Sequence, residues 1–407
     1  MDPNPVIKQN KSSKKSKSKN KSKPKSKSKK SKEVPNPTKT VFSIYLGTYE
    51  GKIIVNNINI KTKENISNFS FTSSQNAIRT IYHKSGSLFV SGTDEIIHMF
   101  DVNKKISEGD LMTYSGSVND IKINNNYLIV AGENNTIPIW RMNDFNNIIE
   151  LKGHKKAINS IDIHSSGGIL VSASRDKCVI IFDLLTGRKI EKFEFDFICN
   201  KVELFDKDKY LMVVFDLHIY ILDLMKNSNG NDNIIQKLNF NKKILNAFVV
   251  KNKLIILFTD GEIITYKLNI KDEENINEKN EKEEEISIDK DDEIGENIIN
   301  INSELKINLE KPEKKDENDL DIKARFVSIC KIDKIRIITI SYSNNEVYFY
   351  DLNKIIKYEE IETKKEEQNE KNEEKDKINN NYIKKYGKIE YNIPEKITAI
   401  DSELATI

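Results

Sequence analysis

The sequence has few cysteines and no long apolar run. Its three cysteines, Cys178, Cys199 and Cys330, are widely spaced and match no CxxC or metal-ligand pattern. We therefore expect a reducing compartment in which the thiols act as small apolar residues. The N-terminus has no apolar signal-peptide region, and no stretch approaches the roughly 18 apolar residues of a membrane span. We expect a soluble protein that is neither secreted nor membrane-spanning.

Motifs of common catalytic and cofactor sites are also missing. There is no GxxxxGK loop, no GxGxxG after a strand and no HExxH. Paired carboxylates occur only in low-complexity tracts, where a solvated or interaction role is expected rather than acid–base catalysis. Four histidines stand alone on expected strands or turns: His83, His98, His164 and His218. We therefore expect no enzymatic activity, no cofactor and no metal site.

The near-neutral net charge of +2 hides an uneven distribution of charge. Residues 1–40 form a Lys/Ser tract with almost no apolar side chains, too few to offset the entropy of ordering it. We expect a disordered basic arm that serves as a nuclear or nucleolar address or as a contact for RNA phosphates. The alternative is a solvated tail that only aids solubility. Representative lysines of the arm are Lys14, Lys15, Lys17, Lys29 and Lys30.

The most regular part of the chain is Leu151–Asp183. Its sequence predicts three short strands, Ile158–Ile163, Ile169–Ser174 and Val179–Phe182, separated by a Ser/Gly turn and an Arg-Asp turn. Three strands in about thirty residues cannot bury both faces alone, so the unit must stack on copies of itself. The segment resembles one WD repeat.

Similar segments recur along the chain at nearly constant spacing. When they are aligned on the end of the third strand, the first five intervals are 44, 40, 42, 40 and 44 residues. This period is typical of WD repeats, in which each unit is one four-stranded blade of a propeller. The aligned positions are Asn57, Asp101, Arg141, Asp183, Asp223, Lys267 and Asp351.

The innermost strand of each blade follows the pattern apolar-x-x-apolar. The pattern occurs for blades 2 to 7 at Ile78/Ile81, Val118/Ile121, Ile158/Ile161, Cys199/Val202, Ile244/Ala247 and Phe326/Ile329. Blade 1 lacks it, because Val41–Gly47 is interpreted as its second strand. Lys396–Asp401 repeats the pattern near the C-terminus. We expect this C-terminal strand to complete blade 1 and close the ring, so that no long sheet edge is left open.

The predicted fold is an all-β, seven-bladed WD-repeat propeller interrupted by charged segments. Residues 271–320 carry 19 acidic and 8 basic side chains, and 357–389 is rich in Glu, Lys and Asn. The first segment is long enough to hide an eighth blade, but its composition argues against one, and only Ile298–Leu309 alternates like an outer strand. The predicted division is a 1–40 arm, blades 1 to 6 in 41–270, an acidic insert at 271–320, blade 7 in 321–356, a second insert at 357–389 and the closing strand in 390–407.

A set of polar residues in blade 4 resembles the hydrogen-bonded tetrad of WD repeats. His154 follows Gly153, and it is joined by Asp176, by Ser172 or Ser174, and by Phe182 at the tryptophan position. Phe182 has no indole donor, so the network should be one link short. A Ser-His-Asp nucleophile is disfavoured because no strained nucleophile elbow surrounds either serine.

Blade 2 has a more distinctive sequence over Ser91–Ser117. Its features are Asp94, the strand Ile96–Asp101 with His98 inside it, the pair Lys104-Lys105, and Glu108–Leu111 leading to Ser115-Gly116. This segment resembles the p21-activated protein kinase-interacting protein family, which are WD-repeat nucleolar factors of large (60S) ribosomal subunit assembly. Gly47–Glu50, Gly132-Glu133 and Ile139-Trp140 add to the resemblance.

The resemblance implies a non-catalytic scaffold in pre-60S biogenesis and pre-rRNA processing, located in the nucleolus and nucleus. The implied partners are assembly factors and ribosomal proteins, with pre-rRNA contacted through the basic arm, no membrane, and the chain a monomer within a complex. Two alternatives remain: a negative regulator that binds a p21-activated protein kinase, and a generic WD-repeat adaptor of another complex.

Overall fold

A computed structural model describes residues 41–59, 62, 65–73, 76–113, 116–226, 233–250, 252–269, 300–307, 322–332, 335–351, 387–390 and 397–404. The basic arm at 1–40 and most of both charged inserts therefore lie outside the described residues. Within the described ranges the regular elements are strands, arranged as seven four-stranded antiparallel sheets. No helix among these residues is long and apolar enough to cross a membrane.

The strands follow one another from the inside of each blade to its outside. Blade 1 is the exception, because its inner strand comes from the other end of the chain: β28 (Ile397–Leu404), β1 (Val41–Thr48), β2 (Lys52–Asn59) and β3 (Asn65–Thr72). Blade 2 contains β4 (Ile78–Lys84), β5 (Ser87–Gly92), β6 (Ile96–Asp101) and β7 (Ile106–Met112). Blade 3 contains β8 (Val118–Asn124), β9 (Tyr127–Gly132), β10 (Thr136–Arg141) and β11 (Asn146–Lys152).

The remaining four blades repeat this order. Blade 4 contains β12 (Ile158–Ile163), β13 (Ile169–Ser174), β14 (Cys178–Asp183) and β15 (Lys189–Glu194). Blade 5 contains β16 (Lys201–Phe205), β17 (Tyr210–Val214), β18 (His218–Asp223) and β19 (Ile234–Asn239). Blade 6 contains β20 (Ile244–Val250), β21 (Lys253–Phe258), β22 (Ile263–Asn269) and β23 (Asn300–Ile307). Blade 7 contains β24 (Ala324–Ile332), β25 (Ile335–Tyr342), β26 (Glu346–Asp351) and β27 (Gly387–Glu390).

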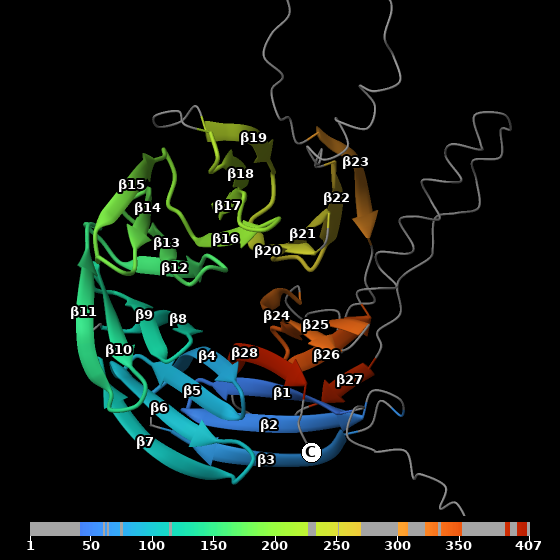
Figure 1. Cartoon of the computed structure of the whole chain (residues 1–407). Helices are drawn as coiled ribbons and strands as arrows, with labels where there is room; N and C mark the ends of the chain where they lie inside the picture. The colour runs from blue at the N-terminus through green and yellow to red at the C-terminus, as the bar shows by residue number, and fades with distance from the viewer. Residues whose placement is uncertain are drawn as a thin grey trace, which may run out of the picture. The chain divides into compact units, whose positions relative to one another are not determined.

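The inner strands contact one another in a closed circuit. β28 packs against β4 and β24, and the contacts continue through β8, β12, β16 and β20. In Figure 1 the red strand β28 accordingly lies beside the blue strand β1. β28 pairs with β1 over Phe42–Thr48, so the last described strand closes the ring on the first. The predicted seven-bladed fold and its C-terminal closing strand are confirmed.

The apolar core lies between the blades. Successive side chains of a strand point to opposite faces of its sheet. On β13, for example, Leu170 packs toward blade 3 and Val171 toward blade 5. Seven clusters of buried side chains among the described residues each join two adjacent blades. Each blade therefore buries its apolar side chains against its two neighbours, as the repeat pattern predicted.

A bulge near the start of the inner strand explains its sequence pattern. In an extended strand, residues three apart point to opposite faces. The register shifts after Ile78, Val118, Ile158 and Ile244, and the extra residue brings both apolar side chains to one face. In blade 5 no such shift occurs, and Cys199 is buried just ahead of β16.

The structure corrects the predicted register of blade 7. The shift there follows Ala324, so the inner apolar pair is Ala324/Val327 rather than Phe326/Ile329. The prediction was displaced because Phe326 and Ile329 have the same apolar-x-x-apolar spacing as Ala324 and Val327, two residues further along the chain. Ala324 is buried, and its small side chain gave a weak signal in the sequence.

The structure also corrects the limits of the two charged inserts. β23 pairs with β22 as the outer strand of blade 6, in the position expected from Ile298–Leu309, so no eighth blade is present among the described residues. Residues 387–389, assigned to the second insert, belong to β27, which pairs with β26. The prediction was wrong there because a four-residue strand with the sequence GKIE is too short and polar to show an alternating pattern.

Candidate functional site

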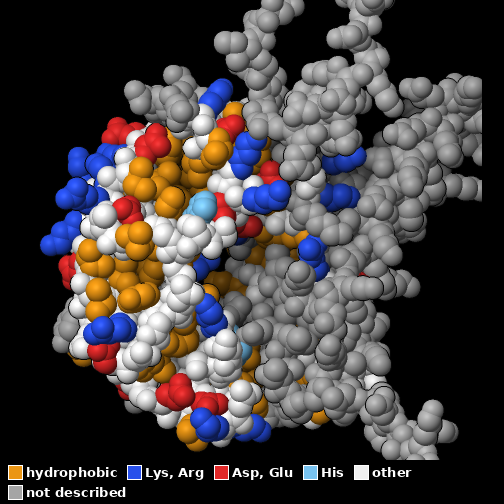
Figure 2. All heavy atoms as spheres, in the orientation of Figure 1, with side chains coloured by type: hydrophobic (Ala, Val, Ile, Leu, Met, Phe, Trp, Pro, Cys, Tyr) orange, Lys and Arg blue, Asp and Glu red, His pale blue; other side chains and the backbone are white. Residues whose placement is uncertain are grey.

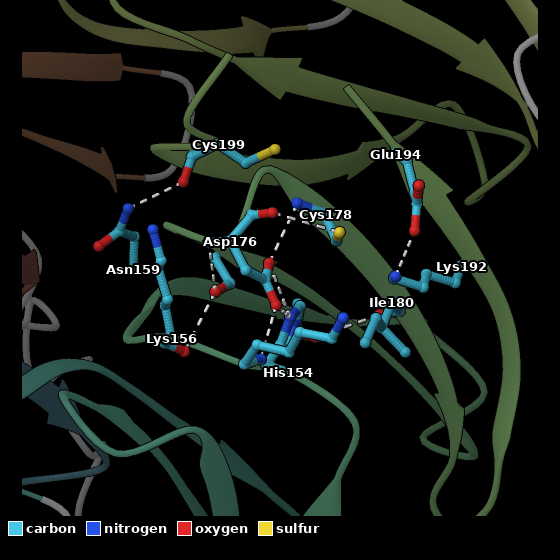
Figure 3. Close-up of polar contacts among 12 residues, drawn as sticks. His154, Lys156, Asn159, Asp176, Cys178, Ile180, Lys192, Glu194 and Cys199 are labelled. Carbon is cyan, nitrogen blue, oxygen red and sulfur yellow. Dashed lines mark hydrogen bonds and ion pairs between the residues drawn. The ribbon is translucent and has the colours of Figure 1, made fainter. Parts of the chain in front are cut away.

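A connected polar site surrounds His154 in blade 4 (Figure 3). His154 lies in the loop between β11 and β12, and Asp176 lies in the turn between β13 and β14. The Nδ1 atom of His154 is 3.1 Å from a carboxylate oxygen of Asp176, and its Nε2 atom is 2.8 Å from the hydroxyl of Ser172. All three side chains are removed from solvent. The ring thus joins a loop to a turn and to the second strand of blade 4.

Burial decides the protonation of this site. Desolvation lowers the pKa of His154, and the charge of Asp176 offsets the effect only in part. A neutral ring donates from Nδ1–H to Asp176 and accepts at Nε2 from the Ser172 hydroxyl. Burial by itself would raise the pKa of Asp176, but hydrogen bonds from the Lys155 N–H and from His154 lower it below its usual range. Asp176 is therefore an anion that several donors hold in place.

The two candidate serines have different roles. Ser172 is the partner of His154, whereas the Ser174 hydroxyl donates to the Lys156 carbonyl and accepts from the Asp176 N–H. Phe182 is fully buried in the core cluster shared with blade 3, where it adds packing and no hydrogen bond. The structure thus brings His154, Ser172 and Asp176 together and places Phe182 in the core beside them.

A second histidine site lies in blade 2. The ring of His98 on β6 lies between two carboxylates: Nδ1 is 2.7 Å from Asp110 and Nε2 is 3.2 Å from Asp94. The ring is buried, while the Asp110 side chain is largely exposed. The sequence singled out Asp94 and His98, and the Glu108–Leu111 segment that contains Asp110, but it did not predict that Asp110 on β7 contacts His98.

The other blade 2 residues stabilise the turn after β6. Asp101 accepts hydrogen bonds from the backbone N–H of Lys104 at 2.8 Å and from its ammonium at 2.7 Å. The Lys104 side-chain hydrogen bond holds the pKa of Asp101 below its ordinary value. Lys105 has a positive φ of 59° and lies over the ring of Phe69. These contacts support a structural role for all three residues in the blade.

Hydrogen bonds between the inner strands of different blades were not predicted from the sequence. A carboxylate oxygen of Asp120 on β8 accepts from the Ser160 hydroxyl at 3.2 Å and the Ile161 N–H at 3.0 Å on β12. The Lys201 ammonium on β16 reaches the Ala247 carbonyl on β20 at 2.6 Å. Burial raises the pKa of Asp120, although the nearby Lys122 opposes the shift. Residues at the x positions of the inner-strand pattern therefore join one blade to the next.

Two cavities open along these inner strands. One of about 470 Å³ is lined by β8, β12, β16 and β20 residues, including Asn119, Asn159 and Lys201. Another of about 320 Å³ is lined by Arg79, Arg325 and their neighbours. Their linings combine amides, cations and hydroxyls with the carboxylates of Asp120 and Asp216. No group of three or more His, Cys, Asp or Glu side chains within the described ranges could hold a metal ion.

Several large apolar side chains remain exposed on the propeller. On the face drawn in Figure 2 they emerge among Lys, Arg, Asp and Glu side chains. Single exposed apolar residues are ordinary, but neighbouring ones mark interaction sites. Phe197, Ile198 and Leu217 form such a neighbourhood, because the Phe197 ring lies 4.3 Å from His218, the residue after Leu217. The lysines of the predicted basic arm lie outside the described residues.

Comparison with known proteins supports this repeat architecture. Residues 145–183, which include the His154 site, match the family model "WD domain, G-beta repeat". The chain is 28% identical over 203 residues to a p21-activated protein kinase-interacting protein 1-like of Danio rerio, covering 47% of this chain and 50% of that protein. It is 25% identical over 266 residues to Protein MAK11 of Saccharomyces cerevisiae, covering 56% and 63%.

A further relative has the same name as the first. It is a p21-activated protein kinase-interacting protein 1-like of Xenopus laevis, 25% identical over 174 residues, which cover 42% of this chain and 46% of that protein. The chain thus spans between about half and two thirds of the length of the curated relatives it matches. The family resemblance inferred from blade 2 is confirmed, and the chain is a WD-repeat propeller of the kind that typically serves as a scaffold.

Proposed function

Starting from the resemblance to the p21-activated protein kinase-interacting proteins, we propose that this chain is a non-catalytic scaffold that joins precursors of the large (60S) ribosomal subunit in the nucleolus. The observation that carries the proposal is its similarity to Protein MAK11 and the kinase-interacting relatives across more than one blade. Protein and RNA partners on such particles would be bound by loops from several blades at once.

The geometry of the polar sites supports a scaffold rather than an enzyme. The histidines of blades 2 and 4 are buried and hold turns in place, and their carboxylate partners accept from backbone or side-chain donors. Ser172 points to His154 from within a regular strand, without the exposed position that a nucleophile needs. These groups stabilise the blades and leave the loops between strands free to bind partners.

The basic arm would add non-specific attraction to RNA or a nuclear address. Deleting residues 1–33 from the tagged protein tests this role separately. Loss of nucleolar accumulation is the expected result, and unchanged accumulation would refute the arm as an address.

The acidic insert would contact basic assembly factors or ribosomal proteins. Its deletion should be limited to 271–299, because β23 completes blade 6 and its loss would damage the propeller. We expect weaker recovery of basic partners from this variant. Full particle association after the deletion would contradict the role of the insert.

Affinity purification of the full tagged chain tests the proposal. We expect recovery of large-subunit precursor RNA together with ribosomal proteins. Recovery of neither would overturn it, even if other proteins copurify.

Kinase binding is the second candidate, because three curated relatives have names that describe interaction with a p21-activated protein kinase. The same purification separates the two functions. A stable kinase complex without ribosomal RNA would favour inhibition of the kinase. A complex with neither would point to a generic WD-repeat adaptor.

A further inference from the structure

The His154 site fixes two loops whose outward side chains are all basic. The backbone N–H of Lys155 donates to Asp176 at 2.7 Å, and the N–H of Arg175 donates to the Ala157 carbonyl at 2.9 Å. The side chains of Lys155, Lys156, Arg175 and Lys177 are exposed beside these bonds. We call these four residues the basic platform.

The charge of the basic platform is largely unopposed. Among the described residues, no ion pair involves any of its four side chains, and Arg175 has a neutral hydrogen bond to Asn159 at 3.1 Å. Of the nearby acids, Asp176 is turned inward to His154, and Glu194 pairs with Lys192 while also attracting Lys155. Asp196, which precedes Phe197 in the loop after β15, is also exposed. The platform therefore presents an excess of positive charge.

An exposed ring lies next to the basic platform. The loop after β15 is bonded to the turn that holds Lys177: the Phe195 N–H donates to the Lys177 carbonyl at 2.9 Å, and the Cys199 N–H donates to the Ser174 carbonyl at 3.4 Å. Between these anchors, Phe197 is 38% exposed and Ile198 is 47% exposed. Cations and a partly exposed aromatic ring therefore share one surface.

From this arrangement we propose that the basic platform of blade 4, together with Phe197 of the adjoining loop, binds single-stranded RNA. Lysine and arginine side chains attract backbone phosphates, and an exposed ring offers a stacking surface that accepts any base. An acidic peptide would satisfy the cations but would make less use of the ring, so RNA is the occupant that matches both features. The His154 site then acts as the support that sets the spacing of the cations.

This inference goes beyond the proposed function, because it assigns direct RNA binding to a defined surface of blade 4. A purified chain and a synthetic RNA test it without ribosomal particles. The probe is a fluorescent oligouridine of about 12 nucleotides, within the site sizes typical of single-strand binders. The full chain is used, and because the basic arm is identical in every variant, a difference in binding between variants does not come from the arm. Fluorescence anisotropy is measured over a series of salt concentrations.

The test variant is Lys155→Gln/Lys156→Gln/Lys177→Asn. Asparagine is chosen at the last position because Lys177 has a positive φ of 67°, which asparagine tolerates. The matched control is Lys189→Gln/Lys207→Asn/Lys226→Gln, which removes three exposed lysines at the other ends of the strands, one of them also at positive φ. Equal urea midpoints for both variants and the unmodified chain establish that all three are folded.

The expected result is a change in how the RNA-binding constant depends on salt concentration. Each lost phosphate contact on a single strand reduces the slope of log K against log salt by about 0.7, so three contacts reduce it by about 2. The control should keep the slope of the unmodified chain. Phe197→Ala should weaken binding by about fivefold or more without changing the slope.

Two results would overturn the proposal. The first is an unchanged slope in the test variant, or an equal change in the control. The second is a glutamate-rich peptide that binds the unmodified chain more tightly than the RNA does and loses its binding in the test variant, which would identify an acidic protein as the occupant.

Discussion

Replacement of His154 by alanine should be among the most damaging changes at a polar position of the propeller. The substitution removes a side chain that is 1% exposed and leaves Asp176, itself 6% exposed, with fewer donors. The carboxylate keeps the N–H groups of Lys155 and Cys178, so it is not left wholly unpaired. The Ser172 hydroxyl loses its partner at 2.8 Å and can turn to the Ile180 carbonyl at 3.2 Å.

These contacts set the size of the effect. A hydrogen bond to an ionised group contributes about 2 kcal/mol and a neutral one about 1 kcal/mol, so His154→Ala should lower the free energy of unfolding by about 3 kcal/mol. Ser172→Ala removes only the neutral bond and should cost about 1 kcal/mol. Because both variants lose the same bond, the double variant should cost less than the sum of the two by about 1 kcal/mol.

Urea unfolding followed by tryptophan fluorescence measures these differences. Trp140 is the single tryptophan of the chain and is buried between blades 2 and 3, so its emission reports on the intact ring. A cost for His154→Ala no larger than that for Ser172→Ala would refute the reasoning, because it would mean that the bond to Asp176 adds nothing to stability.

Three further predictions concern packing, pH and ring closure. Gly92→Ala should lower the free energy of unfolding in urea by about 2 kcal/mol, because the added Cβ would lie 2.4 Å from the Ala77 carbonyl oxygen. Gly168→Ala is the control and should be near neutral, because its Cβ would lie 3.7 Å from the nearest atom. Burial lowers the pKa of His83 from 6.5 to about 4, so between these pH values the unfolded chain binds more protons than the folded chain. The free energy of unfolding should therefore fall as the pH drops from 6.5 toward 4. In His83→Gln this fall should be smaller by at most about 3 kcal/mol, and an identical pH profile for the variant and the unmodified chain would contradict the reasoning. Ile397→Ala removes a buried side chain of the closing strand and should cost about 3 kcal/mol; a cost below about 1 kcal/mol would argue against closure of the ring by β28.

The repeat architecture could be predicted because its signals are periodic. The spacing of the third-strand ends and the repeated inner-strand pattern together required seven units and a strand from the C-terminus. The inner-strand pattern has a physical origin that the sequence did not reveal, since a bulge brings Ile158 and Ile161 to one face. Where that signal was weak, at Ala324 in blade 7, the predicted register was displaced by two residues.

The polar sites were only partly predictable, because their partners come from distant segments. Asp176 and His154 are separated by 22 residues but follow a known local arrangement, and the sequence could place them together. Ser160 and Asp120 belong to different blades, 40 residues apart, and no local pattern links them. Asp110 likewise reaches His98 from the outer strand of blade 2. Such contacts depend on the pairing and packing of strands, which sequence spacing alone does not specify.

Sedimentation of an extract containing the full tagged chain tests the proposed function most directly. If the chain is a scaffold of large-subunit assembly, it should migrate with 60S precursor particles and shift to the top of the gradient after ribonuclease treatment. Migration at the top of the gradient without that treatment, in a complex that contains no ribosomal RNA, would contradict the account.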